Sequence, residues 1–247
     1  MIKITSTDNS RIKDVCRLRE RKGRKVLNRY LTEGYRNVKD SLPYLSGAEI
    51  YVSESSFEKY SAEFNVDVVC SDNVFAKMSD TENSQGILCV SDIPSDKFDD
   101  GKDCVYLDGI SDPGNLGTIL RSCLATGFDN VVLAGGVDCY NPKTVRSAMS
   151  AVCKLNICSL SEEISIEKLK EKGFVIICAD MSGKNLFDCR FGDAKKCLVI
   201  GSEANGVSDL ALRKADVIVS LPMGRIESLN AAVCASVMMY ELKYNKK

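Results

Sequence analysis

The chain contains no histidine, and this absence removes several common kinds of active site. Ser-His-Asp triads, proton transfer by imidazole and the common histidine-containing zinc sites are excluded. The 12 cysteines include no C-x-x-C pair, and most of them lie inside apolar runs. Such cysteines are typical of reduced, buried thiols, so we expect a cytoplasmic protein without a metal site.

Long apolar segments and an export signal are also missing. No apolar run approaches the roughly 20 residues that a membrane span needs. Met1 leads into a polar, basic stretch, which does not resemble a signal peptide. We therefore expect no contact with a membrane.

Two nucleotide-binding fingerprints are absent as well. A Rossmann site needs G-x-G-x-x-G directly after its first strand and an acidic residue at the end of its second strand. The loop after the strand expected at 104–107 gives Gly114-Asn115-Leu116-Gly117 but no G-x-G-x-x-G, and the strand expected at 130–134 ends in Gly135-Gly136 without an acidic residue. No G-x-x-x-x-G-K-[ST] motif occurs either. These absences disfavour a nucleotide-dependent oxidoreductase.

The composition otherwise suits a globular protein. A length of 247 residues fits one large or two modest domains, and a hydrophobic content of 45% can fill their cores. The net charge of -1 argues against a uniformly basic nucleic-acid coat. The charge is uneven, however, because arginine and lysine are concentrated in residues 8–29.

The basic segment 8–29 has a thin apolar stripe at helical spacing, formed by Ile12, Val15 and Leu18. The dense positive charge beside this stripe predicts contacts with RNA phosphates, and a solvated helix face is the alternative. The candidate RNA-binding residues are Arg11, Arg17, Arg21, Lys22, Arg24 and Lys25.

Short strands and helices alternate along the first hundred residues, which predicts a small α/β unit. The expected helices are 35–45, 57–64 and 72–78, and the expected strands are 49–52, 66–70 and 86–90. Residues 91–102 are polar and contain proline, so we expect a linker there. The predicted domains are therefore 1–98 and 103–247.

The second half predicts a parallel sheet with helices on both faces, because its strands are almost continuously apolar. The expected strands are 104–107, 130–134, 155–159, 174–179, 197–200 and 217–221. The expected helices are 116–127, 141–152, 166–172 and a last one from about 229.

Three polar clusters follow strands of this sheet, at the edge where open α/β sheets bind ligands. They read Asn115-x-Gly117-x-x-x-Arg121, then Gly201-x-Glu203-x-x-Gly206, then Pro222-Met223 through Ser228-Leu229-Asn230. Each cluster alone has an ordinary interpretation as helix caps, a surface arginine or a turn. Their occurrence together, in this order, is more specific.

The segments 107–121, 198–206 and 221–230 resemble the three motifs of the SpoU (TrmH-like) RNA ribose methyltransferases, which belong to the SPOUT class. The resemblance covers about 103–244, and the first hundred residues resemble the L30e-like substrate-binding extension more loosely. After Asn230 the family usually continues with Val-Ser, whereas this chain has Ala231-Ala232.

The resemblance implies an α/β protein whose C-terminal SPOUT domain contains a deep trefoil knot. It also implies an S-adenosylmethionine site and a homodimer through the knotted domain. The cofactor would lie against Gly201, Leu221, Met223 and Leu229. The last helix, with Ala231, Ala235 and Met238, would suit the dimer interface.

The implied reaction is methyl transfer to a ribose 2′-hydroxyl in single-stranded or loop RNA. The implied catalytic residues are Arg121, Asn115, Glu203, Ser228 and Asn230. A guanidinium stays protonated at ordinary pH, so we expect Arg121 to stabilise the alkoxide and orient a phosphate. Asn115, Ser228 and Asn230 would shape the pocket and orient Arg121, and Glu203 would hold the loop geometry.

The separate first domain favours ribosomal RNA of the 23S type over tRNA as the substrate. A tRNA 2′-O-methyltransferase of the same fold, a resistance-type rRNA methylase and a non-catalytic knotted RNA-binding protein remain alternatives.

Overall fold

The computed structural model describes residues 1–245, and its contacts divide the chain into two compact units. Unit 1 consists of 1–94 and 138–154, and unit 2 consists of 95–137 and the chain from 155 onward. The predicted domains, 1–98 and 103–247, differ from this division in residues 138–154, which pack with the first hundred residues. Within 1–245, no helix is long and apolar enough to cross a bilayer.

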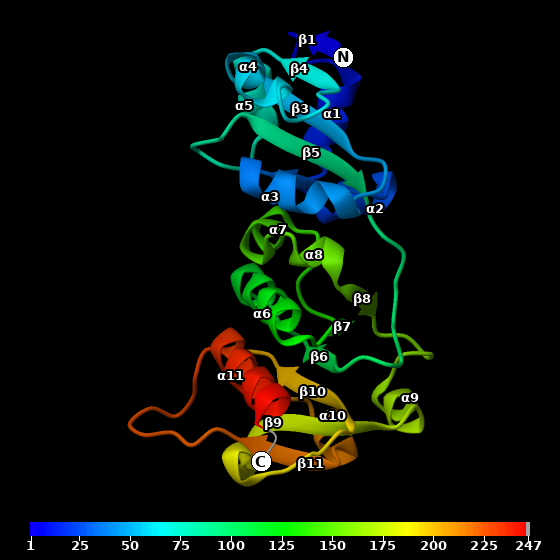
Figure 1. Ribbon diagram of the computed structural model, residues 1–247, viewed down its shortest axis with the longest axis vertical. Helices are drawn as coiled ribbons and strands as arrows, with labels where there is room; N and C mark the ends of the chain where they lie inside the picture. The colour runs from blue at the N-terminus through cyan, green and yellow to red at the C-terminus, as the bar shows by residue number, and fades with distance from the viewer. Residues whose placement is uncertain (246–247) are drawn as a thin grey trace. The chain divides into compact units, whose positions relative to one another are not determined.

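Unit 1 is built on a five-stranded mixed sheet in the order β1-β4-β3-β5-β2 (Figure 1). Its strands are β1 (Ile2–Ile4), β2 (Arg29–Glu33), β3 (Glu49–Ser53), β4 (Val68–Cys70) and β5 (Ile87–Asp92). β4 is parallel to both β1 and β3, whereas β5 is antiparallel to both β3 and β2. The sequence did not predict the two edge strands, because β1 is very short and β2 begins and ends with charged residues.

Helices pack on this sheet and bury apolar residues whose helical spacing predicted a buried face. They are α1 (Ser10–Arg17), α2 (Arg21–Leu27), α3 (Tyr35–Ser41), α4 (Phe57–Ser61), α5 (Asp72–Met78), α7 (Pro142–Ala148) and α8 (Ala151–Lys154), with short 3-10 turns at Leu42–Tyr44 and Glu54–Ser56. The predicted stripe of Ile12, Val15 and Leu18 is buried in one of the two apolar clusters of the unit. The basic segment is two helices rather than one, because the chain turns between Leu18 and Glu20.

Arg24 does not lie on an RNA-accessible face, and this prediction was wrong. Its side chain is only 2% exposed. Its Nε and Nη2 donate to Asp138 Oδ2 at 2.9 and 2.7 Å, and its Nη1 donates to the carbonyls of Leu18 and Arg19. A buried guanidinium needs such a full set of partners, so Arg24 holds residues 138–154 to the turn between α1 and α2.

Unit 2 is built on a six-stranded sheet in the order β11-β9-β10-β6-β7-β8. The strands are β6 (Cys104–Asp108), β7 (Asn130–Ala134), β8 (Asn156–Ser159), β9 (Phe174–Asn185), β10 (Lys195–Gly201) and β11 (Val217–Ser220). Every pairing in it is parallel, as the continuous apolar runs predicted. The protein is therefore an α/β protein with a mixed sheet in unit 1 and a parallel sheet in unit 2.

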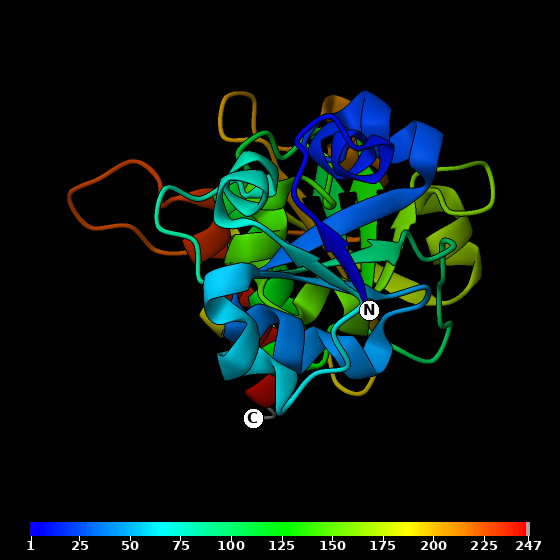
Figure 2. The same ribbon diagram turned by 90° about the horizontal axis from the view of Figure 1, so that it is seen from above.

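The helices of unit 2 place three loops at the carboxyl edge of the sheet. The helices of this unit are α6 (Pro113–Thr126), α9 (Ile166–Glu171), α10 (Asp209–Lys214) and α11 (Ala231–Tyr244), with a 3-10 turn at Leu186–Asp188. The first and last, α6 and α11, pack side by side, and Ser122 Oγ lies 2.6 Å from Ser236 Oγ. The loop between β11 and α11, orange in Figures 1 and 2, extends away from the body of the unit in both views.

The last helix, α11, buries a different face from the one expected at a dimer interface. Ala235 and Met238 are 0% and 2% exposed, because they pack inside their own unit. The exposed face instead carries apolar and aromatic side chains at helical spacing: Val233, Val237, Tyr240 and Tyr244.

The cysteines are free thiols in the described part of the chain, and most of them are buried. Burial raises the pKa of the Cys178 and Cys158 thiols to about 12. Thiols with such values stay protonated at neutral pH and are poor nucleophiles.

Candidate active site

A cavity of about 530 Å³ lies in unit 2, at the carboxyl ends of β10 and β11 and beside the middle of β9. This volume is in the range of small-molecule sites, and the position is the one at which parallel sheets bind ligands. The four residues predicted to hold a cofactor, Gly201, Leu221, Met223 and Leu229, all line it. Their role in binding stays a prediction.

Three of the predicted catalytic residues form one chain of hydrogen bonds beside this cavity. Asn230 Nδ2 donates to Asn115 Oδ1 at 2.9 Å, and Asn115 Nδ2 donates to Glu203 Oε1 at 2.6 Å. The three residues come from the start of α6, the loop after β10 and the start of α11. The polar clusters that are far apart in the sequence therefore meet at one place.

The capping interpretation of the two asparagines is correct for one of them. Asn230 is the N-cap of α11, and its Oδ1 accepts from the backbone N–H groups of Ala232 and Val233. The N-cap of α6 is Asp112, whose Oδ1 accepts from the backbone N–H of Asn115. The side-chain amide of Asn115 is thus left to connect the other two loops.

Ser111 is a member of this network that the sequence analysis missed. Its backbone N–H and its Oγ both donate to Glu203 Oε2, at 3.3 and 3.0 Å. Partial desolvation pushes the pKa of Glu203 upward, but the hydrogen bonds from Asn115 and Ser111 outweigh it and leave the pKa below its usual value. Glu203 is therefore a charged acceptor that joins the β6–α6 loop to the loop after β10.

The loop after β10 needs its glycines for its own backbone. A Cβ at Gly201 would lie 1.9 Å from the carbonyl carbon of Gly206 and 2.1 Å from the nitrogen of Val207. Gly206 has a φ of 67°, which favours glycine, and Ser202 and Gly206 exchange backbone hydrogen bonds. The returning loop itself therefore requires glycine at 201.

Arg121 and Ser228 occupy different places relative to the cavity. Ser228 is an exposed residue of the cavity wall. Arg121 is exposed on α6, outside the lining residues, and makes no hydrogen bond or ion pair within residues 1–245. Its guanidinium is therefore not engaged by another group of the described chain.

The cavity suits a ligand with an apolar part and a positive charge, as in S-adenosylmethionine. Leu221, Leu229 and Met238 supply apolar walls, and the carboxylates of Glu203 and Asp180 lie on the same cavity. Asp180, Met181 and Cys234 are lining residues that the sequence analysis missed. Asp180 and Met181 could have been predicted from the sequence, because they directly follow the apolar run 174–179.

The candidate RNA-binding residues of unit 1 differ in what holds them. Arg17 pairs with Asp14 at 3.0 Å, and Arg11 lies 3.9 Å from Glu49. The remaining candidates, Arg21, Lys22 and Lys25, are exposed on α2 and have no partner in the described part of the chain.

Comparison with known proteins identifies the family. The family described as SpoU rRNA methylase matches residues 103–240, which is more than half of the chain. The chain belongs to the SpoU rRNA methylase family. The MRM3-like substrate binding domain matches residues 9–89, so unit 1 contains the match to a substrate-binding module.

Similar proteins cover the whole chain. The 23S rRNA (guanosine(2553)-2′-O)-methyltransferase RlmP of Bacillus subtilis is 29% identical over 98% of this chain and 100% of its own length. The crystal structure of an RNA 2′-O ribose methyltransferase has a TM-score of 0.80 and 29% identity, with 97% of each chain covered. An AdoMet-bound rRNA methyltransferase from Sinorhizobium meliloti has a TM-score of 0.85 and 25% identity over 99% of this chain and 98% of its own.

The reaction class that the motifs predicted is confirmed. The SpoU family member described here is an S-adenosylmethionine-dependent RNA 2′-O-methyltransferase. The cavity at the carboxyl ends of β10 and β11 is the candidate cofactor site of this enzyme.

Proposed function

We propose that the protein methylates a ribose 2′-hydroxyl of a 23S-type ribosomal RNA. The observation that carries this proposal is the junction of Asn115, Glu203 and Asn230 beside a cavity that suits S-adenosylmethionine. Similarity over the full length to a 23S rRNA methyltransferase supports ribosomal RNA as the substrate. A tRNA substrate remains the alternative, as does a resistance-type rRNA methylase.

The bound cofactor supplies a methyl group that its sulfonium charge already activates. The protein has to hold the 2′-oxygen in line with this group and favour its negative charge as the proton leaves. Arg121 is the residue we assign to this oxygen, since a guanidinium stabilises an alkoxide and binds a neighbouring phosphate. Asn115, Ser228 and Asn230 would shape the site around it.

Glu203 would act on the loops rather than on the substrate. Its carboxylate is held by Ser111 and Asn115, so it is already committed as an acceptor. We assign it to keeping the β6–α6 loop and the loop after β10 at a fixed separation. The proton of the 2′-hydroxyl would then pass to phosphate or water.

We also propose that the C-terminal domain contains a trefoil knot and that the N-terminal domain is L30e-like. The loops after β10 and β11 both line the same cavity, and α11 packs back on α6 and β10, which is compatible with a threaded chain. A cytoplasmic location is proposed on the free, mostly buried thiols.

A homodimer through unit 2 is proposed from the exposed face of α11. Val233, Val237, Tyr240 and Tyr244 are between 38% and 61% exposed and share one face of the helix. A contiguous apolar face of this kind is typical of an interface. Val237→Glu should convert a dimer to a monomer in sedimentation velocity, and a wild-type protein that sediments as a monomer would contradict this proposal.

RNA contact by unit 1 is proposed for the exposed cations of α2. Arg21, Lys22 and Lys25 have no partner within residues 1–245, whereas Arg11 and Arg17 have carboxylates nearby. Free surface cations can neutralise RNA phosphates without first breaking an ion pair.

The proposal is tested by methyl transfer from labelled S-adenosylmethionine to unmodified rRNA and tRNA, followed by digestion to nucleosides. Label in a 2′-O-methylnucleoside of rRNA is the expected result. Label only in tRNA would overturn the choice of RNA, and label on a base would overturn the ribose assignment. Cofactor binding with no transfer to any RNA, including pre-ribosomal particles, would overturn the proposed function.

A further inference from the structure

A second cavity, of about 280 Å³, lies entirely within unit 1, beside the edge strand β2. The junction of β2 and α3, the loop between α5 and β5, and helix α7 form its walls. Its lining includes Glu33, Arg36, Asn83, Gln85, Arg146 and Met149. None of these residues belongs to the site described above.

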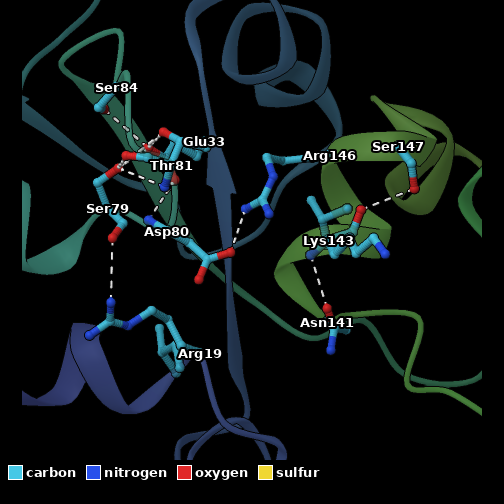
Figure 3. A network of polar contacts seen from close by, with 12 residues as sticks. Arg19, Glu33, Ser79, Asp80, Thr81, Ser84, Asn141, Lys143, Arg146 and Ser147 are labelled. Atoms are coloured by element: carbon cyan, nitrogen blue, oxygen red, sulfur yellow. Dashed lines mark hydrogen bonds and ion pairs between the residues drawn. The ribbon is translucent and has the colours of Figure 1, made fainter. Parts of the chain in front are cut away.

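The loop between α5 and β5 is held in place by Glu33, at the end of β2 (Figure 3). Glu33 Oε1 accepts hydrogen bonds from Thr81 Oγ1 at 2.7 Å, from Ser84 Oγ at 3.0 Å and from Ser79 Oγ. Its Oε2 accepts from the backbone N–H of Asp80 at 3.1 Å. The carboxylate is therefore used to shape one wall of the cavity, and little of it is left for a ligand.

Two further contacts fix the other walls. Arg146 Nη1 donates to Asp80 Oδ2 at 2.7 Å, which ties α7 to the same loop (Figure 3). Gln85 Oε1 accepts from the backbone N–H of Tyr35 at 2.7 Å. This bond uses the oxygen of the Gln85 amide and leaves its NH₂ group as a donor on the cavity.

Three side chains of the cavity are free or only loosely held. Arg36 is 83% exposed, and its Nε makes a long ion pair of 3.8 Å with Asp40 Oδ2 one helical turn further along α3. Asn83 is exposed and makes no hydrogen bond in the described part of the chain. Met149 is partly exposed and supplies an apolar, polarizable surface.

We propose that this cavity binds one unpaired nucleotide of the RNA substrate. Side-chain amides, here those of Asn83 and Gln85, match the donor and acceptor edges of a nucleobase. The Met149 thioether offers the base an apolar contact, and Arg36 is placed for the attached phosphate. Proteins that read RNA sequence mostly bind such unstacked bases, and this volume suits one base rather than a helix. The inference rests on the proposed function, because it takes RNA to be the substrate.

The test uses two cavity variants and one matched control in the full-length protein. Arg36→Ala removes the phosphate contact, and Asn83→Ala removes a base contact. Lys3→Ala removes one positive charge from β1, the edge strand on the opposite side of the same sheet. Each protein is measured for its affinity for unmodified 23S-type rRNA at several salt concentrations, its KM and kcat for methylation, and its affinity for S-adenosylmethionine.

The two cavity variants should fail in different ways. Arg36→Ala should weaken RNA binding and reduce the slope of log K against log salt by about 0.7, because one phosphate contact is lost. Asn83→Ala should raise the KM for RNA roughly fivefold to tenfold with an unchanged salt slope, because it removes a base contact. In both, kcat at saturating RNA and the affinity for S-adenosylmethionine should stay at the wild-type value, and Lys3→Ala should match the wild type throughout.

Wild-type affinity and KM in both cavity variants would overturn this inference while leaving the proposed function intact. A wild-type protein that methylates no RNA would overturn the proposed function instead. Free AMP and GMP distinguish a mononucleotide site from an RNA site. We expect either mononucleotide to compete with RNA only at millimolar concentration. Micromolar binding of either mononucleotide, without an effect on RNA binding, would overturn the assignment to RNA.

Discussion

The two ends of the parallel sheet in unit 2 both border hollows, and the larger one is not at the candidate active site. The amino ends of β6 and β10 border a hollow of about 890 Å³, compared with about 530 Å³ at the carboxyl ends. At the amino end, Lys196 Nζ donates to the carbonyls of Gly192 and Ala194, and Lys195 Nζ donates to those of Lys172 and Asp100. These lysines hold the chain itself, so little of their charge is left for a ligand.

The carboxyl end is smaller but brings together groups from separate loops. Glu203 is bonded to Ser111 and Asn115, and Asn115 to Asn230, so three loops share one network. Beside this network the cavity wall is apolar at Leu221 and Leu229. Convergence of loops, rather than volume, therefore distinguishes the end at which we expect chemistry from the end that stabilises the fold.

The largest effect should come from Arg121→Lys, at the residue that we assign to the 2′-oxygen. The substitution keeps the charge but removes the planar fork, and loss of one such stabilising group costs about 100-fold to 1,000-fold in kcat. The affinity for S-adenosylmethionine should not change, because Arg121 does not line the cavity. Single-turnover methylation and calorimetric binding measure the two quantities.

The same substitution at the amino end is the control for Arg121. Arg190 is exposed beside the larger hollow, where its Nη1 donates to the carbonyls of Phe187 and Cys189. Arg190→Lys should leave kcat within about twofold of the wild type. A kcat close to the wild-type value in Arg121→Lys would contradict the role that we assign to Arg121.

The difference between the two ends was partly visible in the sequence. The continuous apolar runs predicted all six strands of unit 2, and the three polar clusters predicted which loops meet. Ser111 was missed, because a serine in a loop has no periodicity and becomes meaningful only once Glu203 is placed opposite it. Asp180 was missed because the apolar run predicted a strand that ends at 179, whereas β9 continues through Asp180 to Asn185.

Unit 1 was harder to predict from its sequence. Arg24 is one of several arginines in a basic segment, and nothing local distinguishes it from Arg21, which is exposed. Its burial depends on Asp138, more than a hundred residues away, so only the tertiary structure identifies it as structural. The same holds for α7, which packs on β2 although it lies in the second half of the chain.

Gly201→Ala should have the next largest effect, and it should act on cofactor binding. The new Cβ would meet the backbone of Gly206 and Val207, so the loop after β10 must move. We expect the affinity for S-adenosylmethionine to fall about tenfold to 100-fold, or roughly 1.4–2.8 kcal/mol. Gly224→Ala is the control, because a Cβ there meets nothing within 4 Å. Equal affinities in the two variants would show that the loop tolerates the displacement.

Glu203→Gln should have a smaller effect, with a distinct pH dependence. The amide keeps the shape of the carboxylate but weakens its hydrogen bonds by about 1 kcal/mol, so we expect roughly fivefold lower affinity for S-adenosylmethionine. In the wild type, the pKa of Glu203 lies below its usual value. The charged carboxylate therefore stabilises the loop arrangement above about pH 4.3, and this stabilisation is lost as pH falls through the lowered pKa. Binding measured between pH 3.5 and 7 should titrate in the wild type and stay flat in Glu203→Gln. Parallel pH profiles would contradict this.

Lys196→Ala should have the smallest effect on catalysis, because it changes the amino end. Lys196 is 8% exposed, and its Nζ is bonded to two carbonyls, so its removal should cost about 1–2 kcal/mol of unfolding free energy in urea. The kcat of the folded variant should stay within about twofold of the wild type, because no bond to the Glu203 network is lost. A tenfold drop in kcat by fully folded Lys196→Ala would mean that the two ends of the sheet are coupled. The larger hollow would then belong to the catalytic machinery, and loop convergence would no longer be enough to identify the active end.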